Sequence, residues 1–378
     1  MVFLTGPRQI GKTTASKLEA TYYLDWDHLK HRSLISAGPD RVAEHCHLSE
    51  LREKPAVIVF DEIHKFSMWK TFLKGFFDTY GDRCRMIVTG SSKLDVFQKG
   101  GDSLMGRYFP YRMHPLSVGE LLHPDIPQNL IHTPSPTDDK LWNALWTHGG
   151  FPEPLTKSDE RFSRRWRSTR NRQLFKEEIR DLTRIRELSQ LELLGALLEQ
   201  RSGDQLVTTS LAQEIRVAPN TVKAWIDTFT ALHYAFLVKP WFRNVNKALR
   251  KEPKWFLRDW AAVEDPGKRA ETMMACHLLK AVEGWTDLGM GTFELRYIRD
   301  QQKREVDFLI TQNGEPWFLV EVKLTSKKLS EHLRYFQKAT GAKHAFQAVF
   351  ESDHVNADCF NHTSPMVVPA RTFLSQLL

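Results

Sequence analysis

The stretch Gly6-Pro7-Arg8-Gln9-Ile10-Gly11-Lys12-Thr13 decides the fold of the N-terminal part of this chain, because it has the G-x-x-x-x-G-K-[ST] spacing of a phosphate-binding loop. The loop follows an apolar run at residues 2–4, which we expect to be a β-strand, and precedes a helix-forming run at residues 15–20. A chance glycine turn would lack this context. The sequence therefore predicts a nucleotide triphosphate as the ligand.

Each part of the loop has an expected role toward the phosphates. The glycines let the backbone curl, so that its N–H groups point at the β-phosphate. Lys12 is expected to reach the β- and γ-phosphates, and Thr13 to offer its hydroxyl to Mg²⁺. The residues predicted to bind the nucleotide, taken as ATP, are Gly6, Pro7, Arg8, Gln9, Ile10, Gly11, Lys12, Thr13 and Thr14.

Two further strands are expected to complete this site. An apolar strand at residues 57–60 ends in Asp61 and Glu62. We expect Asp61 to hold Mg²⁺ through water, and Glu62 to orient or deprotonate the water that attacks the γ-phosphate. A third strand at residues 86–89 runs into Ser91 and Ser92, whose hydroxyls suit a γ-phosphate sensor. An ordinary exit from a strand into a turn explains these serines equally well.

A second group of carboxylates lies near the C-terminus. Residues 305–310 and 317–323 read as two strands joined by a turn at residues 313–314, and alternation places Glu321 and Lys323 on one face, with Asp307 alongside. Glu271, in a helix expected at residues 270–282, is a fourth candidate. The alternative is a common surface pattern, but an acid such as Asp307 among apolar neighbours is costly to bury without a cation.

This C-terminal pattern resembles the core of PD-(D/E)xK nucleases. The resemblance implies that Glu271, Asp307 and Glu321 bind one or two Mg²⁺ ions, and that Lys323 activates water or stabilises the transition state. Either the module cleaves nucleic acid, or it retains the fold and serves only as a scaffold.

Over almost its whole length, the chain resembles the AAA-type P-loop ATPases that carry a C-terminal DUF4143 region. The resemblance rests on the stretches GPRQIGKTT, VIVFDEIHK, IVTGSS and SLMGRYFPYRMHPLSVGEL. It implies an α/β fold with a RecA/AAA-like parallel sheet, a winged helix-turn-helix and a restriction-endonuclease-like α/β module. The implied domains are an ATPase domain at 1–130, a helical lid and winged helix at 131–248, and a nuclease-like domain at 249–378.

The same resemblance assigns roles within the ATPase part. Asp61 and Glu62 become the Walker B pair, and Ser91 or Ser92 lies near a sensor position. Arg107 lies where an arginine stabilises charge, either within one chain or from a neighbouring subunit of a homo-oligomer; a structural ion pair is the alternative. Members of this family usually have a helical segment before the first strand, so we expect part of the nucleotide-base pocket to be missing here.

The middle of the chain has the pattern of a winged helix-turn-helix. Asn220 is expected to cap the recognition helix, whose exposed start offers only Lys223 as a cation. This favours a packing role over sequence-specific DNA readout. The elements expected are a helix at 189–200, a strand at 206–207, a helix at 210–215, a helix at 221–232 and a wing at 234–242.

A dense basic stretch precedes this segment, and we expect it to form a helix in which Trp166 lies among the arginines. Its cations could neutralise phosphates along nucleic acid, most simply DNA contacted with little sequence specificity. A solvated face, or one paired with an acidic neighbour, explains the stretch equally well. The arginines are Arg161, Arg164, Arg165, Arg167, Arg170 and Arg172.

Composition bounds these interpretations. The 378 residues suggest two or three domains at about 150 residues each, and 41% hydrophobic content suffices for a core in each. The net charge is +7. The sequence lacks a bilayer-spanning stretch and a signal pattern, so we expect a cytoplasmic protein without a membrane partner. Four scattered cysteines predict no disulfide framework, and we interpret His45-Cys46-His47 as surface residues.

Two functional hypotheses follow. In the first, ATP hydrolysis at Lys12, Asp61 and Glu62 regulates a metal-dependent nuclease at the C-terminal carboxylates. In the second, the chain is a nucleotide-controlled switch, and its C-terminal module is a non-catalytic scaffold for DNA or a protein partner.

Overall fold

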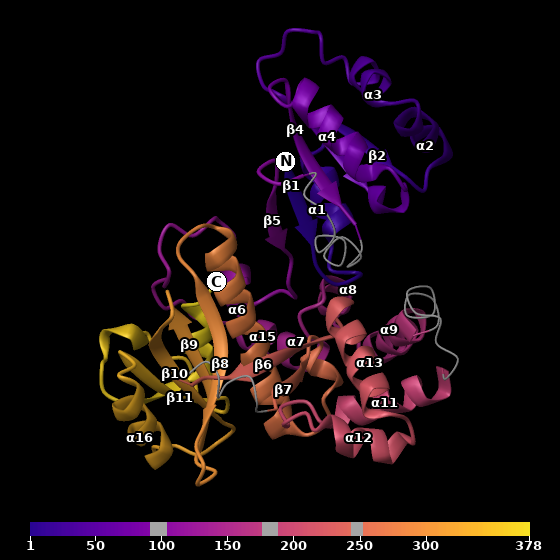
Figure 1. Cartoon of the computed structure of the whole chain (residues 1–378). Coiled ribbons are helices and arrows are strands. Elements are labelled where there is room, and N and C mark those ends of the chain that lie inside the picture. The colour runs from indigo at the N-terminus through magenta and orange to yellow at the C-terminus, as the bar shows by residue number, and fades with distance from the viewer. Residues whose placement is uncertain (91–103, 176–187, 243–251) are drawn as a thin grey trace. The chain divides into compact units, whose positions relative to one another are not determined.

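The computed structural model describes residues 1–90, 104–175, 188–242 and 252–378, which are drawn in colour in Figure 1. Two compact units are formed. One comprises Met1–His114 with Ala231–His233, and the other comprises Pro115–Thr230 with Tyr234–Leu378. The predicted division into three domains, at residues 130 and 248, stays a prediction.

The first unit is built on a five-stranded sheet in which every neighbouring pair of strands is parallel. The strand order is β2-β3-β4-β1-β5. This confirms the predicted α/β class with a parallel sheet of the P-loop, AAA-like type. The strands are β1 (Val2–Thr5), β2 (Tyr22–Asp25), β3 (Ala56–Asp61), β4 (Cys84–Thr89) and β5 (Phe109–Arg112).

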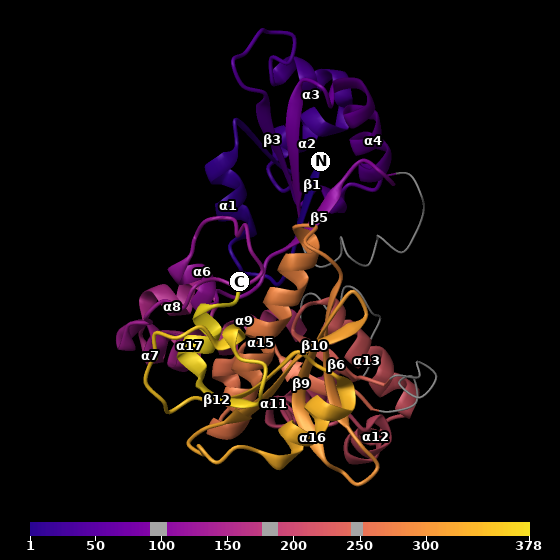
Figure 2. The same ribbon diagram turned by 90° about the vertical axis from the view of Figure 1, so that its left-hand side faces the viewer.

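Helices connect these strands on both faces of the sheet, with α1 on one side and α3 and α4 on the other (Figure 2). In α4, Phe72 and Phe76 recur at the helical period and are buried against Phe60 of β3. The connecting elements are α1 (Lys12–Glu19), α2 (Leu29–Ser36), α3 (Pro39–His45), η1 (Ile63–Lys65) and α4 (Trp69–Tyr80).

The second unit contains a seven-stranded mixed sheet in the order β12-β11-β10-β9-β8-β6-β7. The predicted C-terminal hairpin is present: β9 and β10 pair antiparallel, with Val320 opposite Phe308, and Asn313 and Gly314 turn the chain with positive φ. The strands are β6 (Ala235–Pro240), β7 (Lys254–Leu257), β8 (Phe293–Arg299), β9 (Glu305–Gln312), β10 (Glu315–Lys323), β11 (His344–Val349) and β12 (Met366–Pro369).

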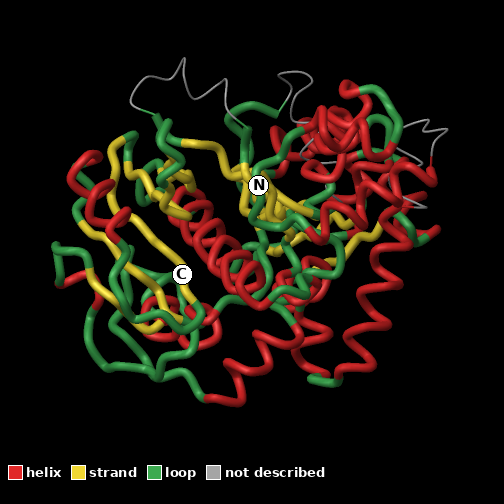
Figure 3. Tube along the Cα trace, turned by 90° about the horizontal axis from the view of Figure 1, so that it is seen from below, coloured by secondary structure: helices red, strands yellow, loops and turns green. Residues whose placement is uncertain are grey.

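Helices pack on both faces of this second sheet (Figure 3). The long helix α15 contributes Met273, Met274 and Trp285 to the larger apolar core, while α16 packs on the other face with Leu333 and Phe336. The helices of the unit are α6 (Val118–Leu122), α7 (Asp139–His148), α8 (Pro152–Lys157), α9 (Glu160–Gln173), α11 (Leu188–Gln200), α12 (Thr208–Ile215), α13 (Pro219–Ala231), α15 (Pro266–Asp287), α16 (Glu331–Thr340) and α17 (Ala370–Ser375), with 3₁₀ turns η3 (Trp260–Ala262) and η4 (Cys359–Asn361).

Several predicted boundaries are wrong. Asn220 does not cap a helix, because α13 begins at Pro219, whose fixed φ suits the first helical position. The expected strand at 206–207 is reduced to one bridge between Gln205 and Lys254. The expected wing is β6, which pairs with β7 and β8 inside the large sheet, and the winged-helix assignment stays a prediction.

Within the part of the chain that the structure describes, no helix combines the length and apolarity needed to cross a bilayer.

Candidate functional site

The phosphate-binding loop has the tight curl that its glycines predict. Gly6, Gln9 and Gly11 all have positive φ, at 138°, 61° and 99°. A Cβ atom on Gly6 would lie 2.4 Å from the carbonyl oxygen of Met113, so that only glycine fits there. Gly11 occupies the N-cap of α1, and the loop therefore ends with the backbone N–H groups of a helix N-terminus.

Lys12 lies inside this loop. Its side chain is buried, with only 9% of the residue exposed, and its Nζ donates to the carbonyl oxygens of Gly6 at 2.8 Å and Pro7 at 2.7 Å. The loop therefore holds an ammonium group among its own carbonyls, in a position that the sequence predicts to face the phosphates.

Asp61 is the centre of the hydrogen-bond network beside the loop. It ends β3 and is 4% exposed. Its Oδ2 accepts from Thr13 Oγ1 at 2.9 Å and from the hydroxyl of Tyr23, and its Oδ1 accepts from Thr89 Oγ1. Three hydroxyls, from α1, β2 and β4, thus converge on one carboxylate.

The residues at this position fit Mg²⁺. Hydroxyl and carboxylate oxygens are the ligands that Mg²⁺ prefers, and Thr13 and Asp61 already contact each other. Within the described residues, the side-chain donors to this buried carboxylate are hydroxyls, which are neutral, so the carboxylate provides negative charge at this position. When bound, Mg²⁺ would neutralise charge on the nucleotide phosphates.

Glu62 adopts a backbone conformation that non-glycine residues rarely take, with φ 55° and ψ 20°. Its N–H donates to the carbonyl oxygen of Thr89, while its carboxylate lies 3.1 Å from Lys65 Nζ. Burial lowers the pKa of Lys65, but contacts with Asp27 and Glu62 outweigh this effect and raise the pKa overall. Strained conformations of this kind cluster at functional sites.

Two residues of this network were not predicted. Burial, followed by the hydrogen bond to Asp61, raises the pKa of Tyr23, so that its hydroxyl remains a donor. Thr89 is the last residue of β4, beside the end of β3. Both residues could have been predicted from their positions in the sequence. Polar side chains near the carboxyl ends of adjacent parallel strands meet at one edge of the sheet.

Three other predicted residues remain, Ser91, Ser92 and Arg107. Ser91 and Ser92 lie outside the described residues. Arg107 forms a two-pronged ion pair with Asp78, with Nε–Oδ1 at 2.6 Å and the second nitrogen at 3.0 Å from Oδ2. This hydrogen bonding lowers the pKa of Asp78. The structural ion pair is therefore the arrangement observed for Arg107, while a role in charge stabilisation stays a prediction.

The predicted C-terminal residues do come together. Asp307 Oδ2 accepts from the backbone N–H of Val322 at 2.8 Å, and Lys323 Nζ donates to Glu321 Oε1 at 2.8 Å. Burial raises the pKa of both Glu271 and Glu321 to about 7. Within the described residues no donor reaches Glu321 Oε2.

A residue that was not predicted lies among these carboxylates. The side chain of Lys254, at the start of β7, is only 5% exposed, and its Nζ lies 2.9 Å from Glu271 Oε1. The same nitrogen lies 2.6 Å from Glu305 Oε1 and 3.7 Å from Asp307 Oδ1. Burial lowers the pKa of Lys254, but these carboxylates outweigh it and raise the pKa overall.

As arranged, this C-terminal group does not fit a divalent ion. The described residues contain no set of three or more histidines, cysteines or acids placed to hold a metal. The carboxylates surround an ammonium group instead.

The basic stretch divides into two faces on α9. Arg167 points inward, with Nε 3.6 Å from the buried Asp259, and Arg170 is buried with its guanidinium 4.2 Å from the Phe151 ring centre. The helical period of 3.6 residues turns these two arginines inward, so the basic stretch does not form one exposed face, and Arg167 has an acidic neighbour in Asp259. The exposed members are Arg161, Arg164, Arg165 and Arg172.

The expectation for His45-Cys46-His47 also needs correction. His45 and His47 are exposed, but Cys46 is fully buried in the core of the first unit. Burial raises the pKa of its thiol to about 12, so this cysteine is a core residue.

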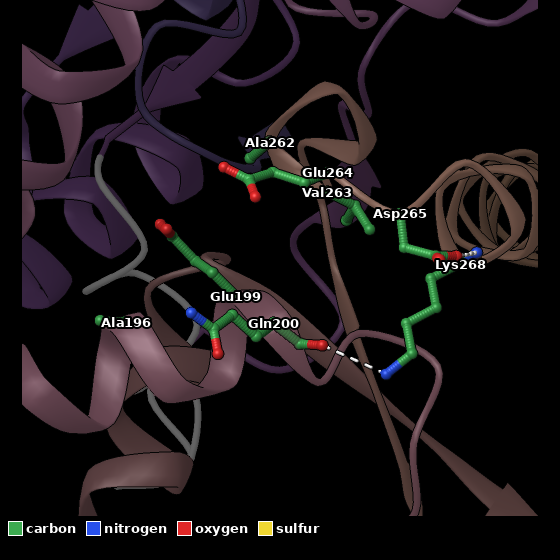
Figure 4. Close-up of a pocket in the computed structure, with 8 residues that line it drawn as sticks. All are labelled: Ala196, Glu199, Gln200, Ala262, Val263, Glu264, Asp265 and Lys268. Atoms are coloured by element: carbon green, nitrogen blue, oxygen red, sulfur yellow. Dashed lines mark hydrogen bonds between the residues drawn. The ribbon is translucent and has the colours of Figure 1, made fainter.

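A polar cleft of about 300 Å³ lies between α11 and the start of α15 (Figure 4). Lys268 spans its edge, donating to the carbonyl oxygen of Gln200 at 3.2 Å and pairing with Asp204. None of the residues predicted from the sequence lines it. The lining residues are Ala196, Glu199, Gln200, Ala262, Val263, Glu264, Asp265 and Lys268.

Comparison with known families agrees with the geometry of the loop. Residues 1–122 match the family model AAA_14, described as an AAA domain. The chain carries an AAA domain at its N-terminal end. Residues 139–263 match a domain of unknown function, DUF8612, and residues 266–366 match another, DUF4143.

Two curated proteins are similar to this chain over most of its length. Uncharacterized proteins of Mycobacterium bovis and Mycobacterium tuberculosis are each 23% identical to this chain over 343 residues. The match covers 86% of this chain and 70% of each relative. An AAA domain implies nucleotide binding, usually with Mg²⁺, and agrees with the arrangement of Lys12, Thr13 and Asp61.

The contact of Gly6 with Met113 gives a test of the loop. Gly6→Ala should destabilise the chain by roughly 2–4 kcal/mol and abolish nucleotide binding, because the new Cβ would overlap a backbone carbonyl. Gly38→Ala is the matched control: its φ is 107°, but no described atom lies within 4 Å of its Cβ position, so it should lose only about 1 kcal/mol and still bind nucleotide. Urea unfolding and nucleotide titration measure both. Equal losses in the two variants would contradict the packing argument.

Proposed function

We propose that this chain binds ATP with Mg²⁺ and hydrolyses it at the phosphate-binding loop. The observation that carries this proposal is the hydrogen bond between Thr13 and Asp61, at the end of a loop that encloses the buried ammonium of Lys12. The match of residues 1–122 to an AAA domain supports it.

The roles of the side chains follow from their chemistry. Lys12 would exchange its bonds to the carbonyls of Gly6 and Pro7 for bonds to phosphate oxygens, which are stronger acceptors because they are charged. Thr13 and Asp61 would hold the Mg²⁺. Glu62 would accept hydrogen bonds from the attacking water once it is released from Lys65.

Separate losses of binding and turnover test these roles. Lys12→Ala should abolish ATP binding, because the loop loses its cation. Glu62→Gln should bind ATP normally but lower kcat by roughly 10²–10⁴-fold, because an amide is a much poorer proton acceptor. ATP titration and phosphate release measure the two quantities.

Glu53→Gln, an exposed glutamate of the same unit, is the control and should change neither quantity. Wild-type turnover in Glu62→Gln would remove Glu62 from the mechanism.

We further propose that the nucleotide-dependent activity acts on nucleic acid, through the exposed face of α9. Arg161, Arg164 and Arg165 lie within five residues of one another on this face, with Glu160 as a nearby acid 3.7 Å from Arg164. Such a face suits a phosphate backbone and carries no sequence information of its own. DNA bound with little sequence preference is therefore the proposed partner.

Salt dependence tests this face. Replacing Arg161, Arg164 and Arg165 by Ala should weaken binding to DNA of any sequence and flatten the slope of log K against log salt by about 0.9 per lost contact. Arg201→Ala is the control, since its guanidinium is already paired with both oxygens of Glu214. Fluorescence anisotropy across a salt series measures the slope. An unchanged slope in the triple variant would return these arginines to the solvated-face interpretation.

We propose ATP hydrolysis and DNA binding for this chain, and not DNA cleavage. Cleavage, as the first sequence hypothesis has it, requires a divalent ion at Glu271, Asp307 and Glu321, and the ammonium of Lys254 lies among these acids.

A further inference from the structure

A largely enclosed cluster of charged side chains joins five elements of the second unit, α15, β7, β8, β9 and β10. It contains carboxylates from α15, β9 and β10, and its central cation comes from β7. The members are Lys254, Glu271, Arg299, Glu305, Asp307, Glu321 and Lys323, hereafter the Lys254 cluster.

We propose that the ammonium of Lys254 occupies the place of a metal ion in this cluster. The Lys254 cluster is then a network of ion pairs that stabilises the second unit without a metal, and not a divalent-metal site. The inference goes beyond ATP hydrolysis and does not depend on it.

The ammonium of Lys254 lies where a bound metal ion would have to lie. Lys254 Nζ is within 4 Å of carboxylate oxygens of Glu271, Glu305 and Asp307, so it occupies the point on which these acids converge. A divalent ion bound by the same acids would need oxygens at about 2.0–2.6 Å around that point. The ammonium and such an ion cannot share it.

The second oxygens of two of the carboxylates are also engaged. Glu305 Oε2 accepts from Arg299 at 2.8 Å, and Asp307 Oδ2 accepts from the N–H of Val322. Gly203 closes the remaining side of Glu271, because a Cβ at Gly203 would lie only 3.0 Å from Glu271 Oε2. Glu305 and Asp307 are therefore oriented by donors from the protein itself, and Gly203 leaves little room beside Glu271.

The charges of the cluster nearly cancel. Four carboxylates are accompanied by three cations, Lys254, Arg299 and Lys323. A divalent ion added to this set would face nearly compensated charge and would have to displace a lysine whose side chain is enclosed. Glu321 Oε2, which meets no donor within the described residues, is one oxygen and does not make a site alone.

The contacts of Lys254 indicate which segments of the second unit the ion-pair network holds together. The residue starts β7 at the edge of the large sheet, and its backbone also bridges to Gln205 ahead of α12. Its side chain then reaches α15 and β9. Through this backbone bridge and these ion pairs, Lys254 stabilises the packing of α12 and β7 against the large sheet and the long helix α15.

Calorimetric titration of Mn²⁺ into the full chain without nucleotide tests the proposal. All variants carry Asp61→Asn, which removes the metal site proposed at the phosphate-binding loop and keeps the two proposals separate. The chain with Lys254 intact should give no saturable isotherm. Lys254→Met should gain one, because the acids lose their central cation, and adding Asp307→Asn should abolish it.

Lys280→Met is the matched control, since Lys280 is also a buried lysine of this unit but, among the described residues, forms an ion pair with one carboxylate, that of Glu120. It should lower the unfolding midpoint without gaining Mn²⁺ binding. Mn²⁺ binding with Lys254 intact that Asp307→Asn abolishes would overturn the proposal. This arm needs no lysine variant and holds even if Lys254→Met fails to fold. A folded Lys254→Met chain that binds no Mn²⁺ would overturn it as well.

Discussion

The buried carboxylate of Asp61 is the constraint on which the candidate nucleotide site depends. A carboxylate that is 4% exposed must be hydrogen-bonded or neutralised. Thr13, Tyr23 and Thr89 supply the hydrogen bonds, and each comes from a different element of the parallel sheet or its first helix. The strand order, with β3 between β2 and β4, is what brings them together. The fold and the site are therefore consequences of the same topology.

The second unit solves a similar problem in a different way. Its buried acids are accompanied by a lysine and two further cations instead of neutral hydroxyls. Removing one member of a buried ion pair is strongly destabilising, because an uncompensated charge is left behind. At the phosphate-binding loop, the side-chain donors that the described residues offer to Asp61 are neutral hydroxyls, and its negative charge therefore suits a metal ion. The contrast between hydroxyls and ammonium separates the site that fits Mg²⁺ from the one that does not.

Sequence reasoning succeeded where the determining pattern was local. The loop from Gly6 to Thr13 and the hairpin turn at Asn313-Gly314 are short motifs, and the structure contains both. It failed where partners come from distant parts of the chain. Lys254 precedes its partner Glu305 by about fifty residues, and no local spacing marks it. The inward turn of Arg167 and Arg170, in contrast, was available from helical periodicity, since Trp166 marks the buried face of α9.

Electron paramagnetic resonance of Mn²⁺ bound to the full chain with ATP tests the central claim most directly. The account predicts a protein-bound Mn²⁺ signal that requires ATP, is lost in Asp61→Asn, and is unchanged in Asp307→Asn. Bound Mn²⁺ that persists in Asp61→Asn, or that depends on Asp307, would contradict it.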